Sequence, residues 1–374
     1  TFGASHINAI AGYTMQETKS TFTSLSGQGF PTGSGLENLS SAAVITKGSA
    51  NGTSFGLVSY LGRLNFEHQG KYLFSATVRT DGSSRFSQND RYGIFPSVSA
   101  GWRISREDFF SSNELITDLK IRASYGVTGD QEIGNFQNIS FWQPGRYLGL
   151  SGLRPRNLAD PNLTWQSNRS LNIGIDFEIL RGRISGSVDY FKSNKTNLLS
   201  NDIIPGTTGF ATITRNRGEI LNRGLEFAVS TVNINKGKFR WNSNFNLTFL
   251  HNEIIDLTNN GLLISAYSDI SPTHVLKKGE ALGTFWAVKY AGVDPQNGDA
   301  MYYNLNGDKV PASEITNDDA QIAGKATPDY FGGFNNTFNV GNFETSASEL
   351  GFQRRTPNRQ QCCFLFSSGQ LWRK

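Results

Sequence analysis

The chain has 374 residues, with 35 Lys and Arg against 31 Asp and Glu, for a formal net charge of +4. The basic residues are dispersed, which excludes a nucleic-acid-binding face because such a face concentrates Lys and Arg on one patch. Mean hydropathy is −0.37, and no apolar run approaches the roughly 18 to 20 residues that a membrane helix needs. These values exclude a helical membrane protein but not a β-barrel, whose lumenal half is polar.

The cysteine content and the first residue of the chain further limit the classes of protein to which it can belong. The two cysteines, Cys362 and Cys363, are adjacent, which excludes a disulfide framework and a Cys-based zinc site. The chain starts at Thr1 with neither a charged leader nor an apolar signal segment. Either a signal segment was removed or the chain is an internal fragment of a longer exported protein, and we expect the fragment.

Apolar and polar residues alternate with a period of two through much of the chain, as expected of strands with one apolar face. The pattern predicts about ten strands: His6–Gln16, Phe55–Glu67, Lys71–Arg79, Ser97–Ser105, Leu119–Thr128, Leu171–Ile179, Arg183–Lys192, Arg223–Asn233, Phe239–Phe249 and Asp329–Asn339. Each is about ten residues long, which is the length that crosses a bilayer at a 45° tilt. Strands of ordinary globular proteins are about half as long.

The alternation also assigns the two faces of this wall. The set expected to face lipid includes Phe74, Val78, Trp102, Ile121, Ile175 and Phe245. The set expected to face the lumen includes Arg79, Arg103, Lys120, Arg122, Asp176 and Arg240.

Short and long connections alternate between these strands. The tight turns are Glu67–Lys71, Leu180–Arg183 and Ile234–Lys238. The long connections, rich in Gly, Asn and Ser, are Glu17–Ser54, Thr80–Pro96, Thr128–Arg169, Ser193–Asn222 and His251–Pro328. Because all the long connections fall on one side, the pattern favours a transmembrane barrel with short periplasmic turns over a soluble β-sandwich or propeller.

Several segments form an ordered series of motifs. They are Tyr72–Phe86 (YLFSATVRTDGSSRF), Arg91–Ser105 (RYGIFPSVSAGWRIS), Leu119–Gly134 (LKIRASYGVTGDQEIG), Pro161–Trp165 (PNLTW), Gly186–Tyr190 (GSVDY), Asn222–Glu226 (NRGLE) and Gly292–Asp299 (GVDPQNGD). In this order the series resembles the SusC/RagA-like TonB-linked receptors of the Gram-negative outer membrane. The resemblance runs from about His6 to Asn342.

The resemblance implies an all-β fold, a 22-stranded barrel with an N-terminal plug inside it. The ten strands would then be a later part of that barrel, with the plug and the TonB-contacting segment absent upstream. It also implies import of a large nutrient, a glycan-derived oligosaccharide or a peptide, without catalysis. The implied partners are outer-membrane lipid, a surface lipoprotein of the SusD type, and the TonB–ExbB–ExbD complex acting through the missing N-terminal region.

The barrel pattern is expected to end at Asn342. From Phe343 to Lys374 the alternation is lost, Glu349 lies in one register and Glu344 in the other, and Pro357 would withhold a ladder donor. We expect residues 343–374 to be an aberrant tail, produced by a frameshift or a truncation, without native barrel structure.

The sequence predicts no catalytic, cofactor-binding or metal-binding residues. The four histidines show no metal-ligand spacing, and no nucleophile elbow, P-loop or dinucleotide fingerprint occurs in a suitable context. The segment Asp294–Asp299 resembles a calcium loop faintly, but it lacks the spacing and the terminal Glu. A hairpin with an Asn-Gly turn explains it better.

Three loop residues are candidates for contact with substrate: Arg85, Trp142 and Trp165. A loop Trp can stack on a sugar ring, but it can equally belong to an interfacial girdle or a loop core. Arg85 follows Asp81 in a turn-forming segment, and bracing of the rim by these two residues is the favoured alternative.

Two other functions compete with energised import. The first is a passive porin or an adhesin barrel, which an upstream plug and TonB segment would rule out. The second is a secreted soluble β-rich protein that binds carbohydrate, which cell fractionation would reveal.

Overall fold

The computed structural model describes residues 3–33, 35, 38–110, 115–257, 262–264, 274–356, 359–367 and 372–373. Within these residues the largest sheet has 13 strands. They are β1 (Ser5–Gln28), β2 (Val44–His68), β3 (Tyr72–Ser83), β4 (Tyr92–Arg103), β5 (Ile116–Asp130), β8 (Gln166–Ile179), β9 (Ile184–Thr196), β12 (Glu219–Lys236), β13 (Phe239–Asp256), β21 (Tyr330–Val340), β22 (Phe343–Thr356), β23 (Arg359–Ser367) and β24 (Trp372–Arg373).

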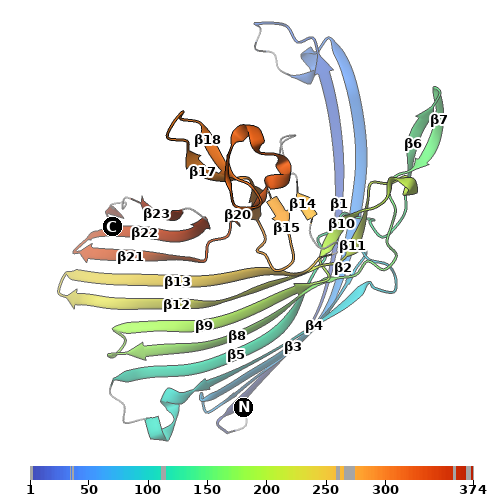
Figure 1. The fold of residues 1–374 in the computed structure, drawn as a ribbon. Coiled ribbons are helices and arrows are strands. Elements are labelled where there is room, and N and C mark those ends of the chain that lie inside the picture. Colours follow the sequence, from blue (N-terminus) through green and yellow to red (C-terminus); the bar gives the residue numbers. More distant parts are fainter. Residues whose placement is uncertain are drawn as a thin grey trace.

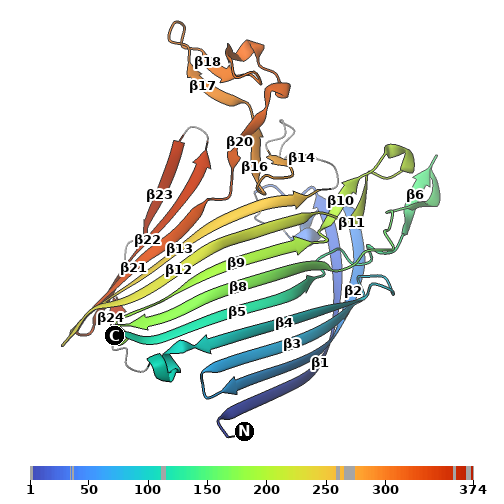
Figure 2. The same ribbon diagram turned by 60° about the horizontal axis from the view of Figure 1, so that its bottom comes forward.

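These strands form a single curved antiparallel wall in which spatial order follows chain order from β1 to β23, with β24 paired to β22. The wall does not close on itself: β1 and β23 form its two free edges (Figures 1 and 2). All ten expected strands are present in it, which confirms the expectation of a long-stranded antiparallel barrel wall.

Most connections at one end of the wall are tight turns, and the β4–β5 connection is longer. At β2–β3, Gln69 and Gly70 both have positive φ, 53° and 65°, and Lys71 N–H donates to the His68 carbonyl over 2.9 Å. Two central residues with positive φ define the hairpin turn whose twist matches that of paired strands. The β8–β9 turn is built in the same way around Arg181 and Gly182.

The long connections at the other end contain small sheets of their own. These are β6 (Trp142–Tyr147) with β7 (Leu150–Pro155); β10 (Leu199–Ile203) with β11 (Thr212–Asn216); β14 (Leu262–Ile264), β15 (His274–Leu276), β16 (Thr284–Ala287) and β20 (Gln321–Lys325); and β17 (Lys289–Val293), β18 (Ala300–Tyr303) and β19 (Lys309–Pro311). The short 3₁₀ turns are Leu39–Ser41, Ile104–Arg106, Asp108–Phe110, Gly206–Thr208, Ala312–Glu314 and Asn317–Asp319.

Among the described residues, no helix has the length and apolar character that a membrane crossing requires.

Cross-strand register confirms the expected division of the two faces. Ile121 pairs with Trp102 on one side and with Ile175 on the other, whereas its chain neighbour Arg122 pairs with Gly101 and Gly174. Paired residues share a face, so the six apolar residues and the six charged residues named above lie on opposite faces. The apolar face is exposed: Phe74, for example, is 44% accessible, which is typical of a surface that meets lipid.

A small polar cluster lies on the apolar face. Ser243 of β13 is in register with the apolar residues but is only 8% exposed. Its hydroxyl donates to Asn336 Oδ1 at 2.6 Å, Asn233 Nδ2 donates to the hydroxyl, and Trp241 Nε1 also donates to Asn336. The cluster satisfies its own hydrogen bonds, as polar groups facing hydrocarbon must.

The first connection is shorter than expected. Residues 17–54 were expected to form a long loop, but β1 continues to Gln28 and β2 begins at Val44, and the two pair almost throughout. Figure 1 shows this hairpin rising well beyond the rest of the wall. The expectation was wrong because main-chain pairing does not require apolar alternation, and the Thr- and Ser-rich ends of this hairpin lie beyond the bilayer-spanning length.

The expected end of the wall at Asn342 is also wrong. Strand β22 pairs with β21 over its length, from Val340 opposite Phe343 to Tyr330 opposite Gln353, and β23 pairs with β22 in turn. The ladder forms because strand pairing is a backbone property; alternation only decides how apolar each face is. Pro357, which was expected to break the ladder, lies outside the described residues.

Candidate functional site

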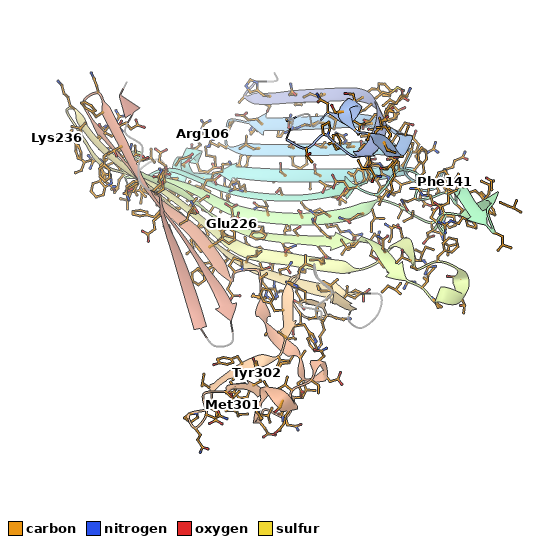
Figure 3. The ribbon with its side chains drawn as sticks, turned by 90° about the horizontal axis from the view of Figure 1, so that it is seen from above. Arg106, Phe141, Glu226, Lys236, Met301 and Tyr302 are labelled. Carbon is orange, nitrogen blue, oxygen red and sulfur yellow. The ribbon has the colours of Figure 1, made fainter. Side chains whose placement is uncertain are left out.

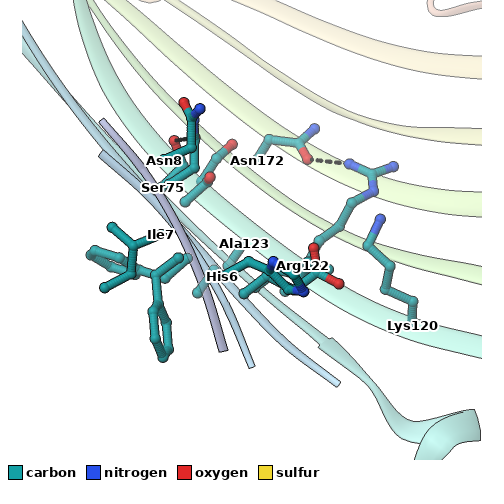
Figure 4. Close-up of a pocket in the computed structure, with 17 residues that line it drawn as sticks. His6, Ile7, Asn8, Ser75, Lys120, Arg122, Ala123 and Asn172 are labelled. Atoms are coloured by element: carbon teal, nitrogen blue, oxygen red, sulfur yellow. Dashed lines mark hydrogen bonds between the residues drawn. The ribbon is translucent and has the colours of Figure 1, made fainter. Parts of the chain in front are cut away.

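The lumenal face of the wall bears a cavity of about 580 Å³ near the β1 edge. Figure 4 shows Asn8, Ser75 and Asn172 on one side of the strands and Ile7 on the other. The polar residues that line it come from six neighbouring strands, β1 to β5 and β8: His6, Asn8, Asn65, Glu67, Ser75, Ser99, Lys120, Arg122, Ser124 and Asn172. Donors and acceptors from six strands therefore converge on one lumenal surface.

Arg122 on β5 is the centre of the strongest electrostatic network of this surface. Its guanidinium donates to Asp176 at 3.1 Å and to Asn172 at 2.9 Å on β8, and it lies 2.7 Å from a carboxylate oxygen of Asp189 on β9. Lys120 donates to Asp176 at 3.1 Å. Charge-assisted bonds of this kind tie three strands together at the half-buried lumenal surface. The sequence placed Lys120, Arg122, Asp176 and Asn172 on the polar face. It did not identify Asn172 and Asp189 as partners of Arg122, because only the register brings them together.

Arg85 braces the rim rather than lying free. Its Nε donates to Asn135 Oδ1 at 2.8 Å, its Nη1 donates to the Gln131 carbonyl at 3.0 Å, and the guanidinium lies 3.9 Å from the ring centre of Phe55. The expected partner, Asp81, instead accepts from Arg79 at 2.7 Å. The bracing interpretation thus suits Arg85, although through other partners than Asp81.

Trp165 lies in a small hydrophobic core under the extracellular loops, packed with Phe86, Phe95 and Leu163. It is 6% exposed, and its ring lies 5.1 Å from that of Phe86 and 5.3 Å from that of Phe95. Its Nε1 donates to the Arg91 carbonyl at 3.0 Å. Because protein covers the ring, this position favours the loop-core role over stacking on a sugar.

Trp142 has the opposite environment. It is 66% exposed at the start of the β6–β7 hairpin, which projects from the rim beside Phe141 in Figure 3. Leu150 and Leu153 on the same hairpin are 73% and 71% exposed. Trp142 and Leu153 share one face of the hairpin, because Leu153 pairs with Pro144, two residues from Trp142, whereas Leu150 lies on the other face.

Within the ranges the structure describes, no three His, Cys, Asp or Glu residues lie close enough to hold a metal ion. The segment resembling a calcium loop forms the β17–β18 hairpin, with Gly298 at φ 82° and the Asp294 carboxylate accepting from the Gln296 amide.

A long-stranded antiparallel wall with an exposed apolar face, a polar lumenal face, tight turns at one end and large loops at the other defines an outer-membrane β-barrel. The sequence matches the family model described as "TonB dependent receptor-like, beta-barrel" over residues 1–348, and the chain belongs to this family. As a member of it, the chain is an outer-membrane protein of a Gram-negative bacterium.

Curated relatives agree with this assignment. The chain is 31% identical to TonB-dependent receptor P3 of Formosa agariphila, over 92% of this chain and 36% of that protein. It is 33% identical to TonB-dependent receptor SusC of Bacteroides thetaiotaomicron, over 86% of this chain and 34% of that protein. The chain thus spans about a third of the length of these relatives.

Among solved structures, the RagAB peptide transporter superimposes with a TM-score of 0.83, over 94% of this chain and 40% of that one, at 22% identity. At this identity the likeness concerns the fold.

Proposed function

We propose that this chain forms part of the wall of a TonB-dependent importer for a large nutrient, an oligosaccharide derived from a glycan or a peptide. The observation that carries the proposal is the polar lumenal surface around Arg122, which lines the path through a barrel whose family is that of TonB-dependent receptors. The RagAB peptide transporter, whose fold the chain shares, supports a peptide, and the oligosaccharide is the class that the resemblance to SusC/RagA-like receptors implies. The protein performs no catalysis in this proposal.

The partners follow from the same proposal. A plug inside the complete barrel couples it to the TonB–ExbB–ExbD complex, which supplies work from the proton-motive force. A surface lipoprotein of the SusD type covers the extracellular mouth. The exposed β6–β7 hairpin, with Trp142, Leu150 and Leu153, supports a role for this loop in contacting the lipoprotein or the incoming substrate.

The test of energised import uses cells that express the complete receptor containing this chain. Uptake of labelled oligosaccharides and of labelled peptides is measured with and without a protonophore, and with and without TonB. Import that stops in both treatments supports the proposal, and the label that enters identifies the substrate class. Uptake that continues in both would establish a passive pore instead.

The role of the β6–β7 hairpin is tested in the same cells. Trp142→Ala removes an exposed ring, so we expect weaker co-purification of the surface lipoprotein or weaker substrate binding, with an unchanged amount of folded receptor. Trp165→Ala is a contrasting variant: it removes a buried ring and should reduce the folded receptor itself.

A further inference from the structure

The outward face of the wall carries a row of cations at its extracellular end. We call the basic row the three residues Arg169 on β8, Lys192 on β9 and Arg223 on β12, all of which are exposed. Lys192 pairs directly with Arg223, and it pairs on its other side with Leu171, two residues from Arg169. The three charges therefore lie side by side on adjacent strands, in register with the apolar, lipid-facing set.

Two carboxylates lie on the same face near the basic row, Glu219 and Glu253, and they are bonded to Asn194 and His251. Within the described part of the chain, none of its three residues forms an ion pair, and the next residue along, His251 opposite Arg223, is bonded to Glu253 at 3.1 Å. The lumenal cations Lys120 and Arg122, by contrast, are paired with aspartates. Like charges directly opposite each other on paired strands repel, so the row is built to meet an anion from outside the chain.

The height of the basic row identifies the environment that it meets. One step nearer the membrane centre lies an aromatic and aliphatic band in a single register: Tyr190, Leu225, Phe249 and Tyr330. At ~3.4 Å per residue and a tilt near 45°, the chain climbs about 20 Å from the periplasmic end of β9 to Lys192. A barrel's apolar band is about 25 Å tall, so Lys192 lies about 5 Å inside its extracellular border, and its long side chain can extend to the lipid headgroups. Arg169, which pairs with Asn194, lies two residues further toward the extracellular side, at that border.

We propose that the basic row binds the phosphate groups of a phosphorylated lipid in the outer leaflet, with the acyl chains packed against the aromatic band below. Arg and Lys are the side chains that recognise phosphate, and Arg binds it with two parallel hydrogen bonds. A lipid is favoured over a protein partner because the row is continuous with the lipid-facing surface and stands just above the band that marks its border. The site would hold an annular lipid at the β8–β9–β12 sector of the barrel.

The test measures lipid binding to the purified complete receptor that contains this chain, after removal of endogenous lipid in detergent. Phosphorylated lipid A and its dephosphorylated form are titrated, and bound lipid is counted by native mass spectrometry. We expect tighter binding of the phosphorylated form, and loss of most of that preference, roughly tenfold, in the Lys192→Gln/Arg223→Gln variant. Arg169→Gln should lose a smaller part.

The controls test whether the lipid preference depends on the charge itself, on the position of the charge and on correct folding. The charge-conserving Lys192→Arg/Arg223→Lys variant should keep the preference, as should Lys236→Gln, which removes an exposed outward cation at the periplasmic end of the wall (Figure 3). Heat-modifiable migration on gels shows that each variant is folded. The proposal fails if the neutral double variant keeps the preference, if the wild type shows none, or if inorganic phosphate alone displaces the lipid. A change in oligomeric state without a change in lipid preference would assign the row to a second copy of the receptor and also overturn it.

Discussion

Neighbouring residues on the central strands face opposite sides of the wall. Ile121 lies on the lipid-facing side and Arg122 points into the lumen, where it is bound to Asp176 and Asp189. The free energy of the folded barrel therefore depends on which of the two positions carries a charge. A charged side chain destabilises the barrel at position 121 and is tolerated at position 122.

Arginine at Ile121 or at Ile175 should destabilise the complete receptor by roughly 2 to 4 kcal/mol if the site lies near the bilayer midplane, because the charge must enter hydrocarbon. Urea-dependent folding into lipid vesicles measures the loss. Cysteines at 121 and 122 report the register independently, since a water-soluble maleimide should label position 122 and spare position 121. Labelling of 121 with protection of 122 would reverse the assigned faces.

Glu107 lies in the periplasmic connection between β4 and β5. It accepts hydrogen bonds from Trp102 Nε1 at 2.9 Å, from the Tyr72 hydroxyl at 2.7 Å and from Lys71 Nζ at 3.1 Å. These bonds, that of Trp102 first, favour the carboxylate and lower the pKa of Glu107 to about 2, from an ordinary value of 4.5.

A lowered pKa gives a stabilisation that is complete above pH 4.5 and is lost as the pH falls from there towards 2. We expect the stability difference between wild type and Glu107→Gln, measured in the complete receptor by urea unfolding, to be largest near neutral pH and to shrink over this range. A difference that grows on acidification would contradict the assigned bonds.

At the scale of elements, the wall tolerates strands with imperfect faces. The outward register of β22 includes Phe343, Thr345, Ala347 and Glu349, and Glu349 lies opposite Phe334 of β21. Pairing on both edges, with β21 and β23, holds such a strand in the sheet even though its lipid-facing side is only weakly apolar.

Glu349→Leu should stabilise the complete receptor by about 1 to 2 kcal/mol, because a carboxylate leaves the lipid-facing register. Glu344→Leu is the matched control: Glu344 pairs with Asn339 on the lumenal side, where an added apolar side chain gains nothing from lipid. Urea titration in vesicles compares the two variants. Equal effects at both positions would show that β22 does not meet lipid in this register.

At the scale of the whole molecule, the decisive feature is the pair of free edges at β1 and β23. Each edge presents a row of unpaired amides and carbonyls, and each such group costs several kcal/mol in hydrocarbon. Closure into a smaller ring would need a different shear from that of the observed register.

Residues 1–374 expressed alone should therefore collect in inclusion bodies and fail to refold in detergent. The complete receptor, refolded in parallel, should yield a heat-modifiable barrel. A monomeric, heat-modifiable barrel from residues 1–374 would show that this wall can close by itself.

Local pattern was enough to predict the ten strands, their faces and the side that bears the long loops, because in a two-sided wall each face imposes its own chemistry on every second residue. The end of the wall and the length of the β1–β2 hairpin were predicted wrongly, since backbone pairing with a neighbour extends strands whose side chains carry no signal. The environments of Trp142 and Trp165, the partners of Arg122 and the basic row were decided by tertiary structure alone. Each depends on residues far apart in the chain, and only cross-strand register brings Arg169, Lys192 and Arg223 together near the extracellular border of the lipid-facing surface.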